Sequence, residues 1–168
     1  MIPDLFWIPG PWTGRLAIVA RPRGGDWLDD EASGWRRAGL DVVVSLLEEQ
    51  EAAQLGLERE DQAAASNDVR FLSFPIADRG APASTQGAVA LLKDMIRALD
   101  AGKNVAVHCR QGIGRSGLIA AAALVTAGMS ADRAVEVVSD ARGQTVPETA
   151  VQQRWINHLP SERLAEAI

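Results

Sequence analysis

The stretch NVAVHCRQGIGRSGLIAAAALVTAGM, residues 104–129, decides the fold of this chain. Its first six residues form a short, valine-rich run that is typical of a strand. Residues 116–128 are rich in alanine and apolar on nearly every side, which predicts a buried central helix. The glycine-containing segment between the two runs is therefore a turn that leads from a strand directly into a helix.

Similar patterns flank this unit on both sides. Further strands are predicted at RLAIVA (15–20), DVVVSLL (41–47) and VRFLSFPI (69–76). One helix is predicted to run to Leu99 after an N-cap at Ser84 or Thr85, and a second follows an N-cap at Ser130. A third helix is predicted to start with a Thr145–Glu148 capping box, with Pro147 in its first turn, and to continue through Trp155. This alternation predicts an α/β fold of three layers, with a mostly parallel central sheet flanked by helices. We expect residues 1–168 to form a single domain.

Composition excludes several classes of partner. The net charge is −5, and the cations are 15 arginines and two lysines, which argues against an extended basic surface for nucleic acid or anionic membranes. The longest apolar run, residues 118–129, is too short to cross about 30 Å of hydrocarbon, and the first ten residues lack the pattern of a signal peptide. The single cysteine permits no internal disulfide, so we expect a cytoplasmic protein. The oligomeric state stays open, with a monomer favoured.

The turn itself supports two interpretations. GIGRSG, residues 112–117, fits the G-x-G-x-x-G fingerprint of a dinucleotide-binding turn. That fold needs a second strand ending in an acidic residue ≈ 20 residues later. The acidic residue near that distance, Asp132, falls in a helical pattern, and no strand pattern follows residue 117. A Walker-type loop is excluded because no lysine follows the glycines.

The second interpretation concerns Cys109, which stands six residues before Arg115. Amide groups at the start of the helix point back at the turn and favour an anion there. Gly112 and Gly114 allow successive amides to turn inward and form a nest for phosphate oxygens. The same field favours the thiolate form of Cys109, and Arg115 can bind two oxygens of the transferred group. These groups together make a phosphoryl-transfer site.

HCRQGIGRSG, residues 108–117, resembles the H-C-x5-R-S/T signature of the cysteine-dependent protein tyrosine phosphatase superfamily, in the form common among its dual-specificity members. The resemblance extends over roughly residues 15–157. FPIADRGAP and ARGQTVPETAVQ, which lie before and after the loop, look most like the kinase-associated phosphatase branch. The dual-specificity phosphatase fold is the one that this resemblance implies.

The resemblance also implies roles for individual residues. Asp78, on a Gly/Pro-bounded loop after a strand, is expected to be the general acid and then the general base. His108 is expected to orient the cysteine loop, Ser116 to help the thiolate depart, and Gln152 to position water. The phosphate-binding residues are then Arg110, Gln111, Gly112, Ile113, Gly114 and Arg115.

Several charged residues are expected to play no part in the chemistry. Glu51 matches an acidic residue that braces the loop arginine in relatives, but a solvated helix charge is the favoured interpretation. Glu148 replaces the first glutamine of the Q-T-x-x-Q segment in relatives and is assigned to the capping box. A plain surface role is favoured for Arg21, Arg23 and Arg79 over a role at the mouth of the site.

The sequence therefore predicts a phosphatase that hydrolyses phosphotyrosine, and also phosphoserine or phosphothreonine, through a phosphocysteine intermediate, with no metal and no cofactor. Gln111 and Ile113 are neutral where phosphoinositide phosphatases of the superfamily carry lysine, which favours a phosphoprotein substrate. The alternatives are a phosphoprotein-binding module without turnover, a phosphoinositide phosphatase and a sulfurtransferase.

Overall fold

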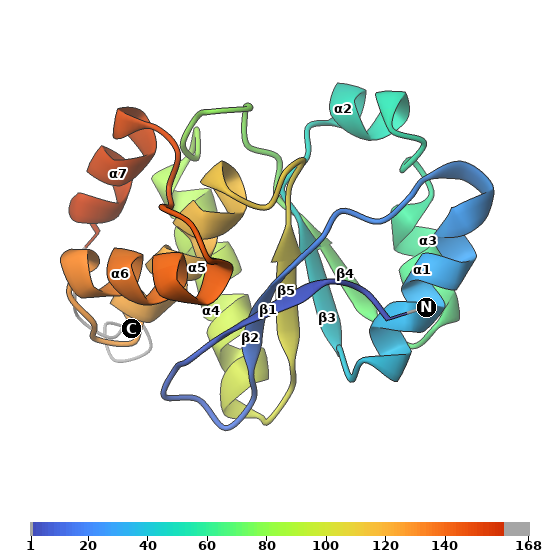
Figure 1. Ribbon diagram of the computed structural model, residues 1–168, viewed down its shortest axis with the longest axis horizontal. Helices are drawn as coiled ribbons and strands as arrows, with labels where there is room; N and C mark the ends of the chain where they lie inside the picture. The colour runs from blue at the N-terminus through green and yellow to red at the C-terminus, as the bar shows by residue number, and fades with distance from the viewer. Residues whose placement is uncertain (1, 160–168) are drawn as a thin grey trace.

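The computed structural model describes residues 2–159. Five strands form one sheet: β1 (Leu5–Ile8), β2 (Leu16–Val19), β3 (Val42–Ser45), β4 (Arg70–Ser73) and β5 (Val105–His108). Their order is β1-β2-β5-β3-β4, and every neighbouring pair is parallel except β1 with β2. The strand before the cysteine, β5, therefore lies at the centre of the sheet (Figure 1).

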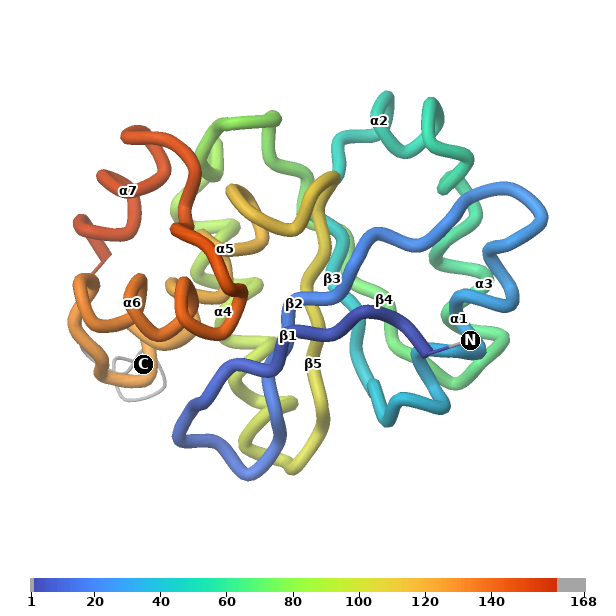
Figure 2. The backbone as a smooth tube through the Cα atoms, in the orientation of Figure 1, coloured from blue at the N-terminus to red at the C-terminus, as the bar shows by residue number. Residues whose placement is uncertain are grey.

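Helices cover both faces of this sheet, as the ribbon and the backbone tube both show (Figures 1 and 2). The longer α4 and α5 pack on one face, together with α6 and α7, and α1 and α3 cover the other face. The helices are α1 (Leu28–Arg37), α2 (Glu49–Gln54), α3 (Glu60–Ser66), α4 (Thr85–Asp100), α5 (Gly114–Thr126), α6 (Ala131–Arg142) and α7 (Ala150–Asn157), with a short 3-10 turn at Gly25–Trp27. The expected three-layer α/β fold is confirmed.

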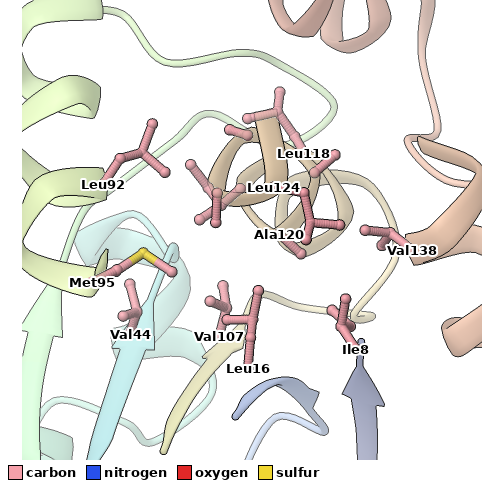
Figure 3. Close-up of a cluster of buried hydrophobic side chains, with 14 of the residues drawn as sticks. Ile8, Leu16, Val44, Leu92, Met95, Val107, Leu118, Ala120, Leu124 and Val138 are labelled. Atoms are coloured by element: carbon pink, nitrogen blue, oxygen red, sulfur yellow. The ribbon is translucent and has the colours of Figure 1, made fainter. Parts of the chain in front are cut away.

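The larger core lies between the sheet and the α4–α7 layer. Each residue of α5 is buried, so this helix is enclosed by β2, β5 and its helical neighbours. Figure 3 shows Leu118 and Leu124 of α5 among side chains from the strands, α4 and α6. Alternation along β5 sends Val105 and Val107 into this core and Ala106 into the smaller core under α1 and α3.

Local signals that set two of the helix starts are confirmed. The Ser84 hydroxyl accepts the Gly87 amide at 3.0 Å, and the Ser130 hydroxyl accepts the Arg133 amide at 3.2 Å. Neither β1 nor the three helices α1, α2 and α3 were predicted from the sequence. Within residues 2–159, no helix is long and apolar enough to span a membrane.

The predicted start of the last helix is wrong. The helix begins at Ala150, and its capping box joins Thr149 to Gln152 rather than Thr145 to Glu148. The cause lies just upstream, where the Ser139 hydroxyl donates to the Val146 carbonyl and accepts its amide. These two bonds hold the chain outside the helix until Thr149.

Candidate active site

Three segments meet beyond the carboxyl ends of β5, β3 and β4. The loop after β5 carries Cys109, the segment after β3 leads to α2, and the segment after β4 leads to Asp78. The loop after β5, the segment after β4 and Glu148 before α7 line a pocket of about 130 Å³. Its lining consists of Asp78, Arg79, Cys109, Arg110, Gln111, Gly114, Arg115 and Glu148. Crevices at this edge of a parallel sheet are the usual ligand sites of open α/β folds.

The cysteine loop is wrapped around its own sulfur. Cys109 is 3% exposed, and the Gly112 amide donates to its Sγ at 3.3 Å. Gly112 has a φ of 72°, a left-handed conformation that a residue with a side chain rarely adopts. Of the two glycines predicted to turn amides inward, Gly112 does so and its amide faces the atom proposed as nucleophile, whereas Gly114 lacks the left-handed φ and is the first residue of α5.

Arg142, at the end of α6, holds the other side of this loop. Its Nε donates to the Gly112 carbonyl at 2.8 Å and its NH2 group to the Gln111 carbonyl at 3.4 Å. The carbonyl and amide of one trans peptide point in opposite directions. When Arg142 holds a carbonyl on the outer side of the cysteine loop, the amide of the following residue therefore points into the loop, toward Sγ. The guanidinium also lies over the ring of Phe6, 4.1 Å from its centroid. Arg142 lies in the quoted segment ARGQTVPETAVQ, but no role was predicted for it from the sequence.

Arg115 is fixed beneath the pocket by a carboxylate and a carbonyl. It is 2% exposed, and its NH1 and NH2 groups donate to the two oxygens of Glu51 at 2.6 and 3.0 Å. NH1 also donates to the Ile76 carbonyl at 2.9 Å. Burial alone lowers the pKa of Arg115, but the bonds to Glu51 and the charges of Cys109, Glu51 and Asp78 outweigh it and raise this pKa.

The expectation for Glu51 is therefore wrong: it is not a solvated helix charge. Its side chain is only 13% exposed and forms a two-bond ion pair with Arg115. The hydrogen bonds from Arg115 lower the pKa of Glu51, against burial, which raises it. Glu51 also accepts the Glu48 amide in a capping box at the start of α2. The contact spans 64 residues, so local spacing gave no sign of it.

Asp78 faces the same arginine from the other side. Its Oδ1 lies 3.3 Å from the NH2 group of Arg115, and its side chain is 62% exposed. The next residue, Arg79, has a φ of 63°, which is uncommon for a residue other than glycine. We call residues 77–80 the acid loop. Its position places a carboxyl group at the open side of the pocket, next to the arginine that would bind the phosphoryl group.

The segment before α7 ties the acid loop in place. Arg79 pairs with Glu148 at 3.0 Å, and its carbonyl accepts the Thr149 hydroxyl at 3.0 Å. The Gln152 side chain is fully buried and donates to the Gly80 carbonyl at 3.1 Å, while its oxygen accepts the amides of Glu148 and Thr149. Glu148 thus lies at the pocket and not in a capping box with Thr145. Gln152 contacts the acid loop, and its role toward water stays a prediction.

Two buried polar groups lie behind the cysteine. Within the described chain, the Ser116 hydroxyl is buried and has no hydrogen-bond partner. His108 is fully buried, with Nδ1 3.3 Å from the Cys109 carbonyl and Nε2 in contact with the Glu60 carboxyl group. Glu60 was not predicted. Its signal in the sequence is a carboxylate that shares one helix face with the buried Ala63 and Ala64.

Arg79 and Arg23, for which a surface role was favoured, differ in their surroundings. Arg79 lines the pocket, contrary to the surface role favoured for it, whereas Arg23 pairs with Glu31 and lies over the ring of Trp27. Among residues 2–159, no group of three or more His, Cys, Asp or Glu side chains is placed to hold a metal ion.

This fold, with a cysteine loop that ends in a buried arginine, defines a phosphatase of the cysteine-based tyrosine and dual-specificity type. The family described as "Polymorphic toxin system, DSP-PTPase phosphatase" matches residues 19–129, and the chain belongs to this family. No match was found among curated proteins.

Solved structures agree on the architecture. Tk-PTP in its active form is 29% identical over the full length of both chains, with a TM-score of 0.77. Kinase-associated phosphatase, with its catalytic cysteine changed to serine, is 17% identical over 93% of both chains, with a TM-score of 0.82. PTPMT1 in complex with PI(5)P is 18% identical over 90% of this chain and 92% of the other, with a TM-score of 0.72. The last two share the fold, and membership in the kinase-associated phosphatase branch stays a prediction.

Proposed function

We propose that the chain is a single-domain phosphatase that hydrolyses phosphoprotein monoesters through a phosphocysteine intermediate. The observation that carries this proposal is the convergence of Cys109, Arg115 and Asp78 on one small pocket. An amide already faces the sulfur in this pocket, and a braced guanidinium lies at its base. Nothing in the proposal requires a metal ion or a cofactor.

In the first step, the Cys109 thiolate attacks phosphorus and the bond to the leaving oxygen breaks. The loop amides and Arg115 bind the three equatorial oxygens, whose negative charge grows in the transition state. Oδ1 of Asp78 lies 3.3 Å from the NH2 group of Arg115. An incoming phosphoryl oxygen takes its place on that guanidinium, and the acid loop then presents the protonated Asp78 carboxyl group to the leaving oxygen.

In the second step, water attacks the phosphorus of the phosphocysteine. The Asp78 carboxylate accepts a proton from this water, the sulfur–phosphorus bond breaks, and inorganic phosphate leaves. The buried Ser116 hydroxyl, which has no partner within the described residues, donates to the departing thiolate. Gln152, close to Gly114 and bound to the acid loop, is the candidate for positioning the water.

The charges at the mouth of the pocket support a phosphoprotein substrate over a phosphoinositide. A ring with additional phosphates would require additional cations. Here Arg79 is paired with Glu148, Arg110 lies 4.0 Å from Glu51, and Gln111 is neutral. PTPMT1, crystallised with PI(5)P, shares only the fold at 18% identity, so phosphoinositide hydrolysis remains the second candidate. By analogy with the dual-specificity members of the superfamily, we also propose activity on phosphoserine and phosphothreonine as well as phosphotyrosine.

The decisive experiment measures phosphate release from a phosphopeptide panel and from phosphoinositides in parallel, with EDTA present and vanadate as inhibitor. We expect turnover of phosphotyrosine peptides, inhibition by vanadate, and no turnover after Cys109→Ser. Asp78→Asn should slow aryl phosphate cleavage on the order of 10²–10⁴-fold. Preferred release from phosphoinositides would refute the substrate assignment. Turnover retained by Cys109→Ser would refute the mechanism.

Two further outcomes separate other classes of protein. A binding module would retain phosphopeptide without forming phosphocysteine in a single-turnover reaction. A sulfurtransferase would turn over thiosulfate and leave aryl phosphates intact. Either result would overturn the proposed function.

A further inference from the structure

A second groove lies between α2, the start of α3 and the ends of β3 and β4, on the side of the sheet away from α4–α7 (Figure 1). Its volume is about 630 Å³, against about 130 Å³ for the pocket around Cys109, and the two cavities share no lining residue. β4 is the edge strand of the sheet formed by residues 2–159, so within this range no further strand covers the groove from that side. The reaction steps described above do not use it.

Small side chains on an apolar floor keep this groove open. The β3–β4 register pairs Ser45 with Ser73, so two short side chains stand side by side where longer ones would fill the space. Alternation along β4 places Phe71 on the same face as Ser73, and Phe71 is half-buried against the smaller core. Leu47 and Leu57, both buried, complete the floor. The groove can therefore accept an apolar side chain.

The charge on the lining has one sign. The lining includes four carboxylate side chains and no lysine, arginine or histidine. Two of these, Glu58 and Asp61, are exposed at the start of α3. Such a field repels a phosphate group and attracts cations. The groove thus complements a segment that combines arginine or lysine with an apolar residue.

The groove and the catalytic pocket are separated by one thin wall. The Ile76 carbonyl accepts NH1 of Arg115 on the pocket side, whereas the preceding residue, Pro75, lines the groove. In α2, Glu51 binds Arg115, and the next residue, Ala52, lines the groove. An extended chain advances about 3.3 Å per residue. A segment with its phosphoresidue in the pocket can therefore cross this wall and enter the groove within a few residues.

We propose that the groove is a docking site for a basic segment of the phosphoprotein substrate, whose cations face Glu58 and Asp61 while an apolar side chain packs on Phe71. This inference rests on the proposed function, because it names the kind of phosphoprotein that the same site takes. The pocket binds the phosphoryl group and the groove binds the cations beside it. Exposed ion pairs each contribute little, so docking raises affinity modestly and weakens as salt is added.

Substrate preference tests this proposal. Two phosphotyrosine peptides are compared, one flanked on both sides by arginines and a leucine, the other by serines, and kcat/KM for each is divided by that for an aryl phosphate. We expect the wild-type chain to prefer the basic peptide about tenfold at low salt and less at high salt. Glu58→Gln with Asp61→Asn should lower this preference about three- to fivefold.

The matched control removes the same two charges from the other face of the sheet. Asp132→Asn with Glu136→Gln changes exposed positions of α6 and should keep the wild-type preference. An equal loss of preference in this control would mean that net charge, and not the groove, attracts the peptide, and would overturn the proposal. A wild-type chain that shows no preference for the basic peptide would overturn it as well.

Binding without turnover separates this inference from the proposed function. The affinity of the unphosphorylated basic peptide is measured by fluorescence anisotropy, and Ala53→Arg adds a cation at an exposed position that lines the groove. We expect Ala53→Arg to weaken binding about three- to tenfold. If no peptide releases phosphate, the proposed function fails, while this shift still supports docking. Equal binding by both proteins would refute docking, and so would a wild-type dimer that Ala53→Arg dissociates, because a second copy would then cover the groove.

Discussion

Replacing Glu51 by glutamine tests how much of the catalytic power of Arg115 depends on its brace. Glutamine keeps one acceptor oxygen and puts an NH2 group where the second oxygen of Glu51 stands. That NH2 group would face the NH2 group of Arg115, donor against donor. The variant therefore loses one charge-assisted bond, now 3.0 Å long, and the negative charge that draws the guanidinium toward α2.

The size of the effect follows from that bond. Hydrogen bonds to charged groups contribute about 1.5–3 kcal/mol, which corresponds to roughly 10- to 150-fold in rate. The bond from NH1 to the Ile76 carbonyl remains, and a bound phosphoryl group pulls on the guanidinium too. We therefore expect kcat/KM to fall about 10- to 50-fold, toward the lower end of that range.

Steady-state hydrolysis of an aryl phosphate measures this loss, and titration with vanadate measures the accompanying loss of anion affinity. The matched control is Glu49→Gln, which changes an exposed glutamate of the same helix that lines a different groove. The reasoning is refuted if Glu51→Gln keeps kcat/KM within about twofold of the Glu49→Gln value, because the ion pair would then not support the reaction.

Three other changes probe the surroundings of the site. Arg142→Met should release the carbonyls of Gln111 and Gly112 and lower kcat about tenfold or more, with an unchanged circular dichroism spectrum. An unaltered kcat would show that Arg142 does not support the cysteine loop. Gly117→Ala should lower the free energy of unfolding, measured by urea titration, by about 1–3 kcal/mol, because the added Cβ would stand 2.7 Å from Cβ of Val146. An unchanged urea midpoint would contradict this close contact between Gly117 and Val146. The pKa values of Glu51 and Asp41 are both lower in the folded protein than their unfolded values, near 4.5 and 3.8. The two carboxylates therefore stabilise the folded protein above those unfolded values, and this stabilisation is lost as the pH falls through the lower folded pKa values. Acid titration of Glu51→Gln should therefore show a weaker fall in stability below about pH 4.5 than wild-type protein, and identical acid titrations would contradict the assigned shift.

The sequence was sufficient for the parts of the site that are close together in the chain. Cys109, Gly112 and Arg115 lie on one strand–turn–helix unit, whose periodicity and glycines predict both the shape and the chemistry. The resemblance to a known signature added Asp78. In the structure Asp78 lies 3.3 Å from Arg115, on a loop that follows a different strand, β4.

The parts that the sequence did not reveal depend on distant contacts. Glu51, Glu60 and Arg142 reach the cysteine loop across 64, 48 and 30 residues, respectively. Glu51 was interpreted as a solvated helix charge, and Glu60 and Arg142 were given no role, because charged residues on helices usually face solvent. The wrong capping box has the same origin. Thr145 and Thr149 offer similar spacing, and bonds between Ser139 and Val146 decide between them.

The ring contact between Arg142 and Phe6 has a consequence for how this enzyme can diverge. Both residues lie outside residues 19–129, the part of the chain that matches the family, one in the edge strand β1 and one at the end of α6. Part of the support for the cysteine loop is thus encoded outside the stretch that matches the family, although Glu51, the brace of Arg115, lies inside it. Substitutions in the outer parts can tune the reaction rate while every signature residue stays the same, so two members with identical loops need not be equally fast.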